Sequence, residues 1–182
     1  MDELRGKFVT TAGFAMAMYE DELEKADAWL KSKVGKGYRD LEPDGWYDLE
    51  IFIKFLDTYA AASPTGEIAH VTTGKRVFPT VKKAGMLPPD LSEPIDFLKF
   101  EFDLYFQCLR GPNIHPRKLL QATDGEVRIE VKNPPYEAFD GLMEGVFWGA
   151  VKMADVDTSN AKVEQTKCAL KGDAVCEYRI TW

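Results

Sequence analysis

The spacing of apolar and polar residues along the chain predicts an N-terminal part that is mainly helical. Apolar positions recur at helical spacing from 21 to 34 and from about 48 to 61, with charged residues between them. Asp48 stands where a helix N-cap is expected. A third helix is predicted from about 63 to 84, opening on a Ser-Pro pair. Ahead of these helices, the run from 7 to 11 has the composition of a short strand.

Residues 94 to 110 form the most apolar helix that the sequence predicts, and we refer to this segment as the aromatic helix. Its polar residues fall on one narrow stripe. The apolar positions are Ile95, Phe97, Leu98, Phe100, Phe102, Leu104, Tyr105, Phe106, Cys108 and Leu109. A helix with so little polar surface is expected to be buried nearly all round, in the core or against a second subunit.

The C-terminal part predicts a β-hairpin, a helix and a second pair of strands. Residues 119 to 122 and 126 to 131 are predicted strands joined by a Thr-Asp-Gly turn, and apolar and charged residues alternate along the second of them. A helix from about 136 to 154 follows. The last strands are expected over about 161 to 169 and 175 to 182.

Length and composition fit one folded domain. The chain has 182 residues, of which 45% are hydrophobic and 29% charged, and it contains no internal repeat or low-complexity linker. We therefore expect residues 1–182 to form a single α+β domain, in which an antiparallel sheet is packed by several helices.

Charge and cysteine content narrow the classes of partner. The chain carries 23 Lys and Arg against 30 Asp and Glu, a net charge of −7, and has no basic cluster, so no nucleic acid partner is expected. No apolar stretch approaches the roughly 20 residues that cross a bilayer, and the N-terminus is not a secretory signal, so no membrane partner is expected. Three cysteines, at least one of them unpaired, fit a reducing cytoplasm.

Gly141, Gly145 and Gly149 lie along one side of the predicted 136–154 helix, because they are spaced by four residues. Each glycine in a helix interior costs about 1 kcal/mol relative to alanine. Three of them on one stripe indicate that another group approaches the backbone closely. That group is either the sheet or a second helix, or a flat or elongated ligand in a groove.

Cys168 and Cys176 flank a predicted hairpin turn near the C-terminus. If the loop has an odd number of residues, the two cysteines lie opposite each other on one face of the sheet. Aromatic and aliphatic residues of the last strand alternate onto that same face, which indicates that it is the inner one. Three interpretations stay open: small core residues, ligands of a metal ion with help from Cys108 or a histidine, or a redox-switchable disulfide.

The chain has only two histidines, which limits the chemistry that it can support. His70 lies in the middle of a predicted helix and is expected to be a satisfied helix residue. His115 lies in the loop after the aromatic helix, and a role as haem axial ligand would need an apolar pocket, which that helix could supply. No Ser/His/Asp order, nucleophile elbow, phosphate-binding loop or zinc-protease motif occurs, so no catalytic residue is predicted.

Aromatic residues make up 12% of the chain and concentrate near Trp46 and in the aromatic helix. Core packing explains most of them. An apolar pocket for a small molecule between the helices and the sheet is the sharper interpretation. The residues predicted to contact such a ligand are Trp46, Phe97, Phe100, Phe102, Phe106, Gly141, Gly145 and Phe147.

The C-terminal half also carries a family-like pattern. It consists of the predicted strand Glu126-Val-Arg-Ile-Glu-Val131, a helix with Glu144-Gly-Val-Phe-Trp-Gly149, and the run Cys168-Ala-Leu-Lys-Gly-Asp-Ala-Val-Cys176-Glu-Tyr-Arg-Ile-Thr-Trp182. In these segments the chain resembles the 4-vinyl reductase domain family and, more loosely, the haem-NO-binding and TRAPP-subunit folds.

The resemblance implies a sensor fold that binds small apolar molecules, often as a homodimer, and that is attached to or partnered with a regulatory output. It also implies that the paired cysteines are metal ligands, which here are Cys168 and Cys176. Because the chain ends at Trp182, where the fold is expected to end, the output is expected to be a separate regulatory protein. The Tyr-x-Ser-x-Arg signature of the haem-NO-binding relatives does not occur.

These features predict a non-enzymatic cytoplasmic sensor or binding protein that encloses a small apolar ligand between the aromatic helix and the sheet and signals to a separate partner. One alternative is a haem- or tetrapyrrole-related binding protein or reductase accessory. The other is a structural dimerisation or tethering module without a ligand.

Overall fold

The computed structural model describes residues 1–132 and 135–182, and within them the chain forms six α-helices and two antiparallel sheets. The helices are α1 (Gly6–Ala15), α2 (Glu20–Val34), α3 (Leu49–Ala62), α4 (Ile68–Lys83), α5 (Pro94–Cys108) and α6 (Glu137–Val151). The strands are β1 (Glu3–Arg5), β2 (Trp46–Asp48), β3 (Leu109–Arg110), β4 (Lys118–Thr123), β5 (Glu126–Val131), β6 (Lys162–Lys167) and β7 (Cys176–Thr181), with a short 3-10 helix η1 (Ala169–Lys171) before β7.

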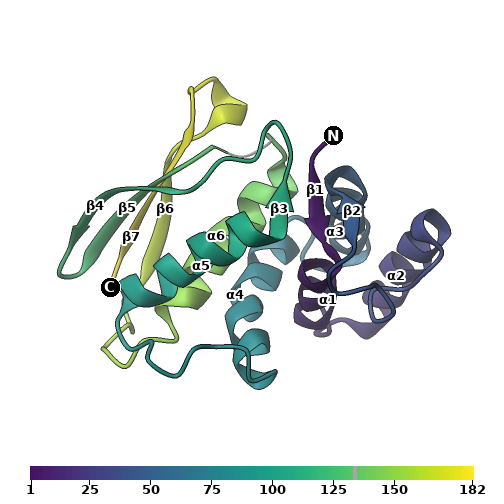
Figure 1. The fold of residues 1–182 in the computed structure, drawn as a ribbon, viewed down its shortest axis with the longest axis horizontal. Helices are drawn as coiled ribbons and strands as arrows, with labels where there is room; N and C mark the ends of the chain where they lie inside the picture. The colour runs from purple at the N-terminus through teal and green to yellow at the C-terminus, as the bar shows by residue number, and fades with distance from the viewer. Residues whose placement is uncertain (133–134) are drawn as a thin grey trace.

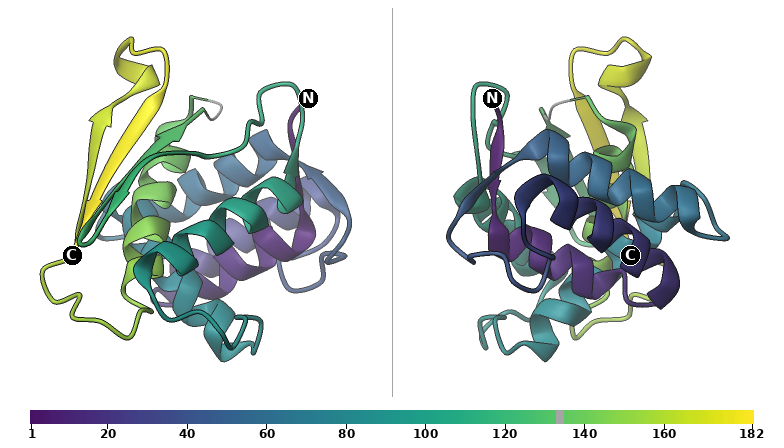
Figure 2. Two further views of the ribbon diagram at one scale, coloured as in Figure 1. Left: turned by 60° about the vertical axis from the view of Figure 1, so that its left-hand side comes forward. Right: turned by 90° about the vertical axis from the view of Figure 1, so that its right-hand side faces the viewer.

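The elements are arranged in layers. The larger sheet lies at one side of the molecule, α6 covers its inner face, and α4 and α5 pack against α6 (Figure 1). Helices α1, α2 and α3 form the opposite end, as the two turned views also show (Figure 2). The small sheet, in the order β2-β1-β3, ties the first residues of the chain to the end of α5.

The larger sheet has the order β4-β5-β7-β6, and all its neighbouring strands are antiparallel. Val127, Ile129 and Val131 of β5 are fully buried against the helices, as are Tyr178 and Ile180 of β7. Apolar residues therefore face inward at every second position, as the alternation in the sequence predicts. The predicted α+β class, an antiparallel sheet packed by several helices, is confirmed.

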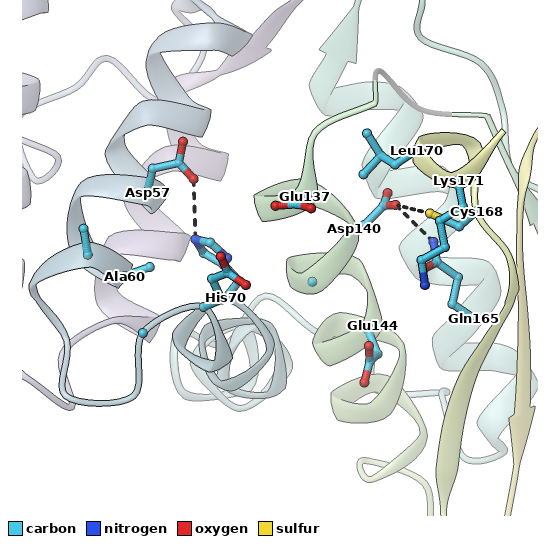
Figure 3. Close-up of a pocket in the computed structure, with 14 residues that line it drawn as sticks. Asp57, Ala60, His70, Glu137, Asp140, Glu144, Gln165, Cys168, Leu170 and Lys171 are labelled. Carbon is cyan, nitrogen blue, oxygen red and sulfur yellow. Dashed lines mark hydrogen bonds and ion pairs between the residues drawn. The ribbon is translucent and has the colours of Figure 1, made fainter.

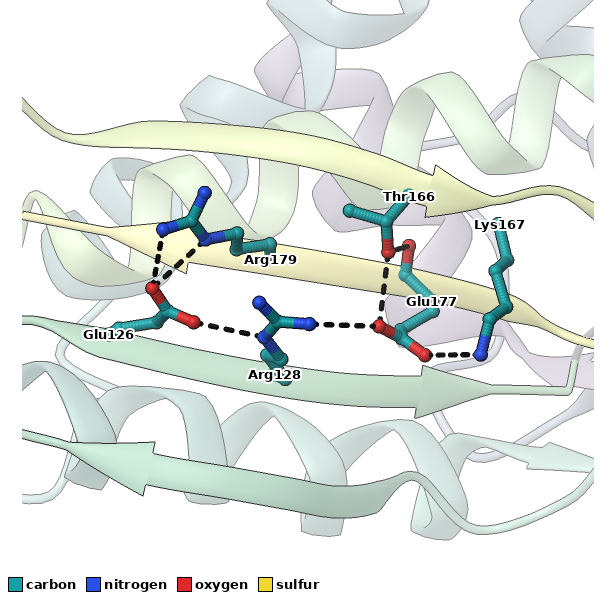
Figure 4. A network of polar contacts seen from close by, with 6 residues as sticks. All are labelled: Glu126, Arg128, Thr166, Lys167, Glu177 and Arg179. Atoms are coloured by element: carbon teal, nitrogen blue, oxygen red, sulfur yellow. Dashed lines mark hydrogen bonds and ion pairs between the residues drawn. The ribbon is translucent and has the colours of Figure 1, made fainter.

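The outer face of this sheet carries a chain of paired charges (Figure 4). Glu126 accepts hydrogen bonds from Arg179 at 2.7 Å and from Arg128 at 2.9 Å. Arg128 also lies 3.7 Å from a carboxylate oxygen of Glu177, which in turn accepts a hydrogen bond from Lys167 at 2.8 Å. Each charge has a partner of opposite sign, which suits a face that meets water.

Local signals place several helices where the sequence predicts them. The Asp48 side chain accepts a hydrogen bond of 2.8 Å from the Glu50 amide and caps α3. Gly35 ends α2 with a φ of 77°, a left-handed conformation that glycine adopts readily. The aromatic helix ends two residues early, at Cys108, because Leu109 and Arg110 pair with β1 as strand β3.

Two predictions about the N-terminal half are wrong. The run from 7 to 11 lies within α1, whose buried residues Gly6, Val9, Ala12 and Gly13 recur at helical spacing. Helix α4 begins at Ile68 and not at Ser63, whose hydroxyl instead bonds within a turn.

The glycines of α6 lie against α4. A Cβ atom on Gly145 would collide with the carbonyl oxygen of Val71 and would lie 2.8 Å from the Cα of Gly74, and one on Gly149 would lie 2.9 Å from the carbonyl oxygen of Lys75. The close approach that three glycines on one stripe predict is therefore the approach of a second helix. Ala at either position would force the two backbones apart.

Helix α5 is buried on one side only. Phe97, Leu98, Tyr105 and Cys108 face the core, but Phe106 is 52% exposed in the single chain. For this face, burial within the core of one chain is therefore wrong, and burial against a second subunit stays a prediction. The apolar residues of α5 encircle the helix, whereas its neighbours cover only part of that circle. No helix in the described ranges is long and apolar enough to span a bilayer.

Candidate functional site

An apolar cavity of about 90 Å³ borders α5 on the side that faces the other helices, and no strand of the described residues lines it, so it does not lie between the aromatic helix and the sheet as predicted. We call it the apolar cavity. It is lined by Lys7, Phe8, Thr11, Ala12, Val77, Val81, Met86, Phe100, Leu104, Cys108 and Leu142, from α1, α4, α5, α6 and the segment after α4. Burial raises the pKa of the Cys108 thiol, which therefore stays protonated at neutral pH and contributes to the wall as a small apolar group.

The predicted ligand-contact residues are distributed over several places. Phe100 lines the apolar cavity, while Phe97 packs edge-on against Phe78 at a centroid distance of 6.3 Å. Phe102 is half-buried and Phe106 exposed on the same helix. Phe147 lies deeper, edge-on to Tyr178 at 5.2 Å. Gly145 contacts α4, whereas Gly141 borders a second, polar cavity.

Trp46 lies apart from both cavities, on strand β2. The guanidinium groups of Arg5 and Arg110 lie 4.5 and 4.1 Å from the centre of its ring. The two cations come from the other two strands of the small sheet, so these cation–π contacts link β1, β2 and β3. Trp46 therefore packs against Arg5 and Arg110 in the small sheet.

A buried ion pair occupies the interior between α5 and α6. The guanidinium of Arg117, whose side chain is fully buried, lies 3.3 Å from a carboxylate oxygen of Glu101 and 3.6 Å from the centre of the Tyr105 ring. Burial raises the pKa of Glu101, and the positive charge of Arg117 opposes that rise. Glu101 lies four residues from both Phe97 and Tyr105 and therefore on the same face of α5. This spacing was the only signal in the sequence that Glu101 is buried.

The second cavity, which we call the polar cavity, has a volume of about 560 Å³. It lies where α3, α4, α6 and the β6–β7 connection meet (Figure 3). Its lining consists of Asp57, Ala60, Ala61, Gly66, Glu67, His70, Glu137, Asp140, Gly141, Glu144, Gln165, Cys168, Leu170 and Lys171. Carboxylates dominate the charged groups of this wall.

Asp140, Cys168 and Cys176 converge at one side of the polar cavity. Their ligand atoms all lie within 4.8 Å of one another, and all three residues are buried. An Asp140 carboxylate oxygen lies 3.6 Å from the Cys176 sulfur and 3.8 Å from the Cys168 sulfur, and it accepts a hydrogen bond of 3.0 Å from Gln165. Both cysteines are free thiols, and burial raises the pKa of Cys176 to about 11.

The hairpin geometry explains why the two cysteines meet. Cys168 follows β6 and Cys176 begins β7, and the chain between them turns through η1 and Gly172, whose φ is 101°. The third member, Asp140, comes from α6 and was not foreseen, because nothing in its neighbourhood in sequence distinguishes it from a surface carboxylate. Cys108, considered as a further ligand, lies instead at the apolar cavity.

His70 faces the opposite wall of the polar cavity. Its side chain is 7% exposed, and its Nε2 lies 3.7 Å from an Asp57 carboxylate oxygen, too far for a hydrogen bond. The ring hydrogen-bonds the backbone of Leu56, but Nε2 has no hydrogen-bond partner among the described residues, so the expectation of a satisfied helix residue holds for only part of the ring. Burial lowers the pKa of His70, although nearby carboxylates oppose the shift, and the imidazole is therefore neutral at pH 7.

The residues present do not fit a haem group. His115 is half-buried in its loop and lines neither cavity, and His70 faces carboxylates and not an apolar pocket. The apolar cavity has about 90 Å³, whereas pockets for drug-sized ligands have about 300 to 1,000 Å³. A porphyrin would therefore have to displace buried side chains, and it would find no histidine on the wall of that cavity.

Comparison with known proteins shows which solved structures have a similar fold. No family model and no curated protein matches the sequence. Among solved structures, the chain is similar to one described under "Modulating Heme Redox Potential Through Protein-Induced Porphyrin Distortion", with a TM-score of 0.73, 15% identity, and coverage of 98% of this chain and 95% of that one. An oxygen-binding H-NOX domain related to soluble guanylate cyclases has a TM-score of 0.71 at 16% identity, with coverage of 98% and 94%.

A T. Tengcongensis H-NOX mutant matches with a TM-score of 0.67 at 16% identity, covering 98% of this chain and 97% of that one. These matches extend over nearly the whole length of both chains. The chain therefore has the fold of H-NOX domains.

Proposed function

We propose that this chain is a non-enzymatic cytoplasmic sensor or binding domain for a small apolar ligand, and that the ligand occupies the apolar cavity. The observation that carries the proposal is the cavity itself, a partly open hollow among α1, α4, α5 and α6 whose wall is almost entirely apolar and whose rim includes the exposed Met86. Close packing leaves few such hollows in a protein, and an apolar one favours apolar guests.

The size of the cavity limits the guest. An engineered apolar cavity of about 150 Å³ accepts benzene or xenon, whereas this one has about 90 Å³. The ligand is therefore smaller than benzene: a dissolved gas or a hydrocarbon of about two to four carbon atoms. At a ceiling of about 1.5 kcal/mol per heavy atom, three atoms bind with at most about 4.5 kcal/mol, a Kd near the millimolar range.

Xenon tests this proposal, because its binding needs only an apolar void. We expect ¹²⁹Xe NMR to show a saturable bound environment in the purified protein, and propene to compete for it. Leu104→Phe should fill the cavity and abolish the signal, since Leu104 lines it. Leu170→Phe, on the exposed side of the polar cavity, should leave the signal unchanged. Absence of saturable binding in the unmodified protein would refute the proposal.

Membership of the 4-vinyl reductase domain family, homodimer formation and signalling to a separate regulatory protein belong to the same proposal. The homodimer is supported by β4, an edge strand whose six residues are all exposed, Leu119 and Leu120 among them. Such an edge can pair with the same edge of a second copy. Light scattering after size-exclusion chromatography should give twice the chain mass, and Leu120→Lys should lower it to the mass of one chain.

A second candidate function is metal binding by Asp140, Cys168 and Cys176. Buried thiols and a carboxylate within 4.8 Å of one another form a donor set that suits Zn²⁺. Gln165 already bonds Asp140 and would orient it. Because each ligand must lose its proton, a bound metal would replace the S–H bonds of the two cysteines and link α6 to the β6–β7 hairpin.

Metal analysis separates this function from the apolar site. We expect protein purified without chelator to hold one zinc ion per chain by mass spectrometry, and Co²⁺-loaded protein to show thiolate charge-transfer absorption. Cys176→Ser should lose the metal and the absorption, whereas Cys108→Ser, remote from the cluster, should keep both. Cysteines that titrate freely with a thiol reagent while the protein stays folded and metal-free would exclude the metal site.

A further inference from the structure

We propose that the polar cavity binds a small organic cation of the aliphatic ammonium class, held by Asp57 and His70 on one wall and by carboxylates of α6 on the other. This site is separate from the apolar cavity and does not depend on the proposed apolar ligand.

The charge of the cavity favours a cation. Five carboxylates line it, and Lys171 is the only Lys or Arg among its lining residues. Glu67 and Glu137 are exposed at its surface, whereas Glu144 is half-buried. Low-dielectric walls that carry one sign of charge concentrate counter-ions of the other sign. An anion or a neutral ligand gains nothing from this field.

An unsatisfied buried nitrogen marks where the cation would lie. Nε2 of His70 and the Asp57 carboxylate lie 3.7 Å apart and do not bond each other, although both line the cavity. Figure 3 shows His70 and Asp57 on one wall and Glu137 on α6 facing them. An ammonium group has several N–H donors, so it can bond the imidazole nitrogen and a carboxylate at once.

Charges from three segments surround His70. Asp57 of α3, Glu67 before α4 and Glu137 of α6 all raise the pKa of His70, which shows that their fields reach its ring. A ligand that carries a positive charge would supply a partner of opposite sign, and it would meet carboxylates from several directions.

The shape of the wall favours an organic cation over a bare metal ion. In the described residues, the group of metal-ligating side chains within 4.8 Å of one another is Asp140, Cys168 and Cys176, and it does not include Asp57 or His70. The volume of about 560 Å³ lies in the range of small-molecule pockets, about 300 to 1,000 Å³. Ala60, Ala61 and Leu170 provide apolar surface for a short alkyl chain.

NMR of the two histidine side chains tests the proposal with an internal control. We would titrate ¹⁵N-labelled protein with n-butylammonium chloride and with 1,4-diaminobutane, using n-butanol as a neutral molecule of similar length. We expect saturable shifts of the His70 ring signals with both amines and none with n-butanol. His115, which does not line the cavity, should not shift. Raising the salt concentration should weaken amine binding.

Matched charge removals identify the contacts. Asp57→Asn and Glu137→Gln should each weaken amine binding about tenfold or more, because each removes a charge-assisted hydrogen bond. Glu24→Gln, the same chemical change as Glu137→Gln on the exposed face of α2, should leave the affinity unchanged. Circular dichroism confirms that each variant is folded.

Three results would overturn the proposal. They are amines that shift His70 no more than n-butanol does, Mg²⁺ that shifts it at lower concentration than the amines, and a Glu24→Gln variant that loses as much affinity as Glu137→Gln. The second result would identify an inorganic cation site and the third a non-specific charge effect. None of them bears on xenon binding in the apolar cavity, so the two sites fail or succeed independently.

Discussion

Replacing Arg117 by methionine tests how much the fold depends on the buried ion pair. The substitution removes the fully buried guanidinium that lies 3.3 Å from Glu101 and 3.6 Å from the Tyr105 ring centre, and it leaves a buried carboxyl group without its cation. Removing one partner of a buried pair costs about 3 to 5 kcal/mol. We expect Arg117→Met to lower the free energy of unfolding by that amount at pH 7.

The pH dependence makes this prediction specific. Burial raises the pKa of Glu101 even in the presence of Arg117, and removal of the cation should raise it further. A carboxyl group with a raised pKa in the folded state favours folding while it is protonated, and this contribution is lost as the pH rises through the folded-state pKa. The destabilisation by Arg117→Met should therefore shrink between pH 7 and pH 5.

Urea denaturation at both pH values measures the effect, with the unchanged chain as reference. The double variant Glu101→Leu with Arg117→Met should recover most of the lost stability, because no charge then stays buried. A loss below about 1 kcal/mol, or one that is the same at pH 5 and pH 7, would refute the account of Glu101 as a desolvated carboxyl group that depends on its cation.

Three further predictions concern the packing of α6 against α4, the titration of His70 and the absorption spectrum of the protein. Gly145→Ala should destabilise the protein by about 3 kcal/mol in thermal denaturation, because its Cβ would collide with α4. Gly35→Ala, whose Cβ would meet no atom within 4 Å, should cost about 1 kcal/mol. Equal losses in the two variants would contradict the packing argument. Because burial lowers the pKa of His70, the unfolded state binds a proton at higher pH than the folded state does, so the free energy of unfolding should fall as the pH drops below about 6.5, the pKa of an unfolded histidine. In His70→Gln this fall should be smaller. A profile that is unchanged in His70→Gln would assign the fall to other groups. The purified protein should show no Soret absorption, even after incubation with haemin, and a stable Soret band would refute the conclusion that the residues do not fit haem.

The sequence by itself determined most of the secondary structure, because the signals involved act over a few residues. Helical periodicity and end signals such as Asp48 and Gly35 located α2 and α3, and the alternation of apolar and charged residues located β5. The hairpin also placed Cys168 and Cys176 near each other, since its two strands are neighbours in sequence. The error at residues 7 to 11 arose because a five-residue run is too short to show the helical spacing of the buried positions Gly6, Val9 and Ala12.

Only the tertiary structure decided which residues meet across elements. Asp140 joins the two cysteines, Asp57 meets His70, and Glu101 meets Arg117 through the way helices and loops cross. The apolar cavity likewise depends on the shapes of side chains from four helices. Local patterns cannot encode such arrangements, because they are set by the packing of the whole chain, in which a shift of one helix by a few ångströms would close a cavity or separate a pair.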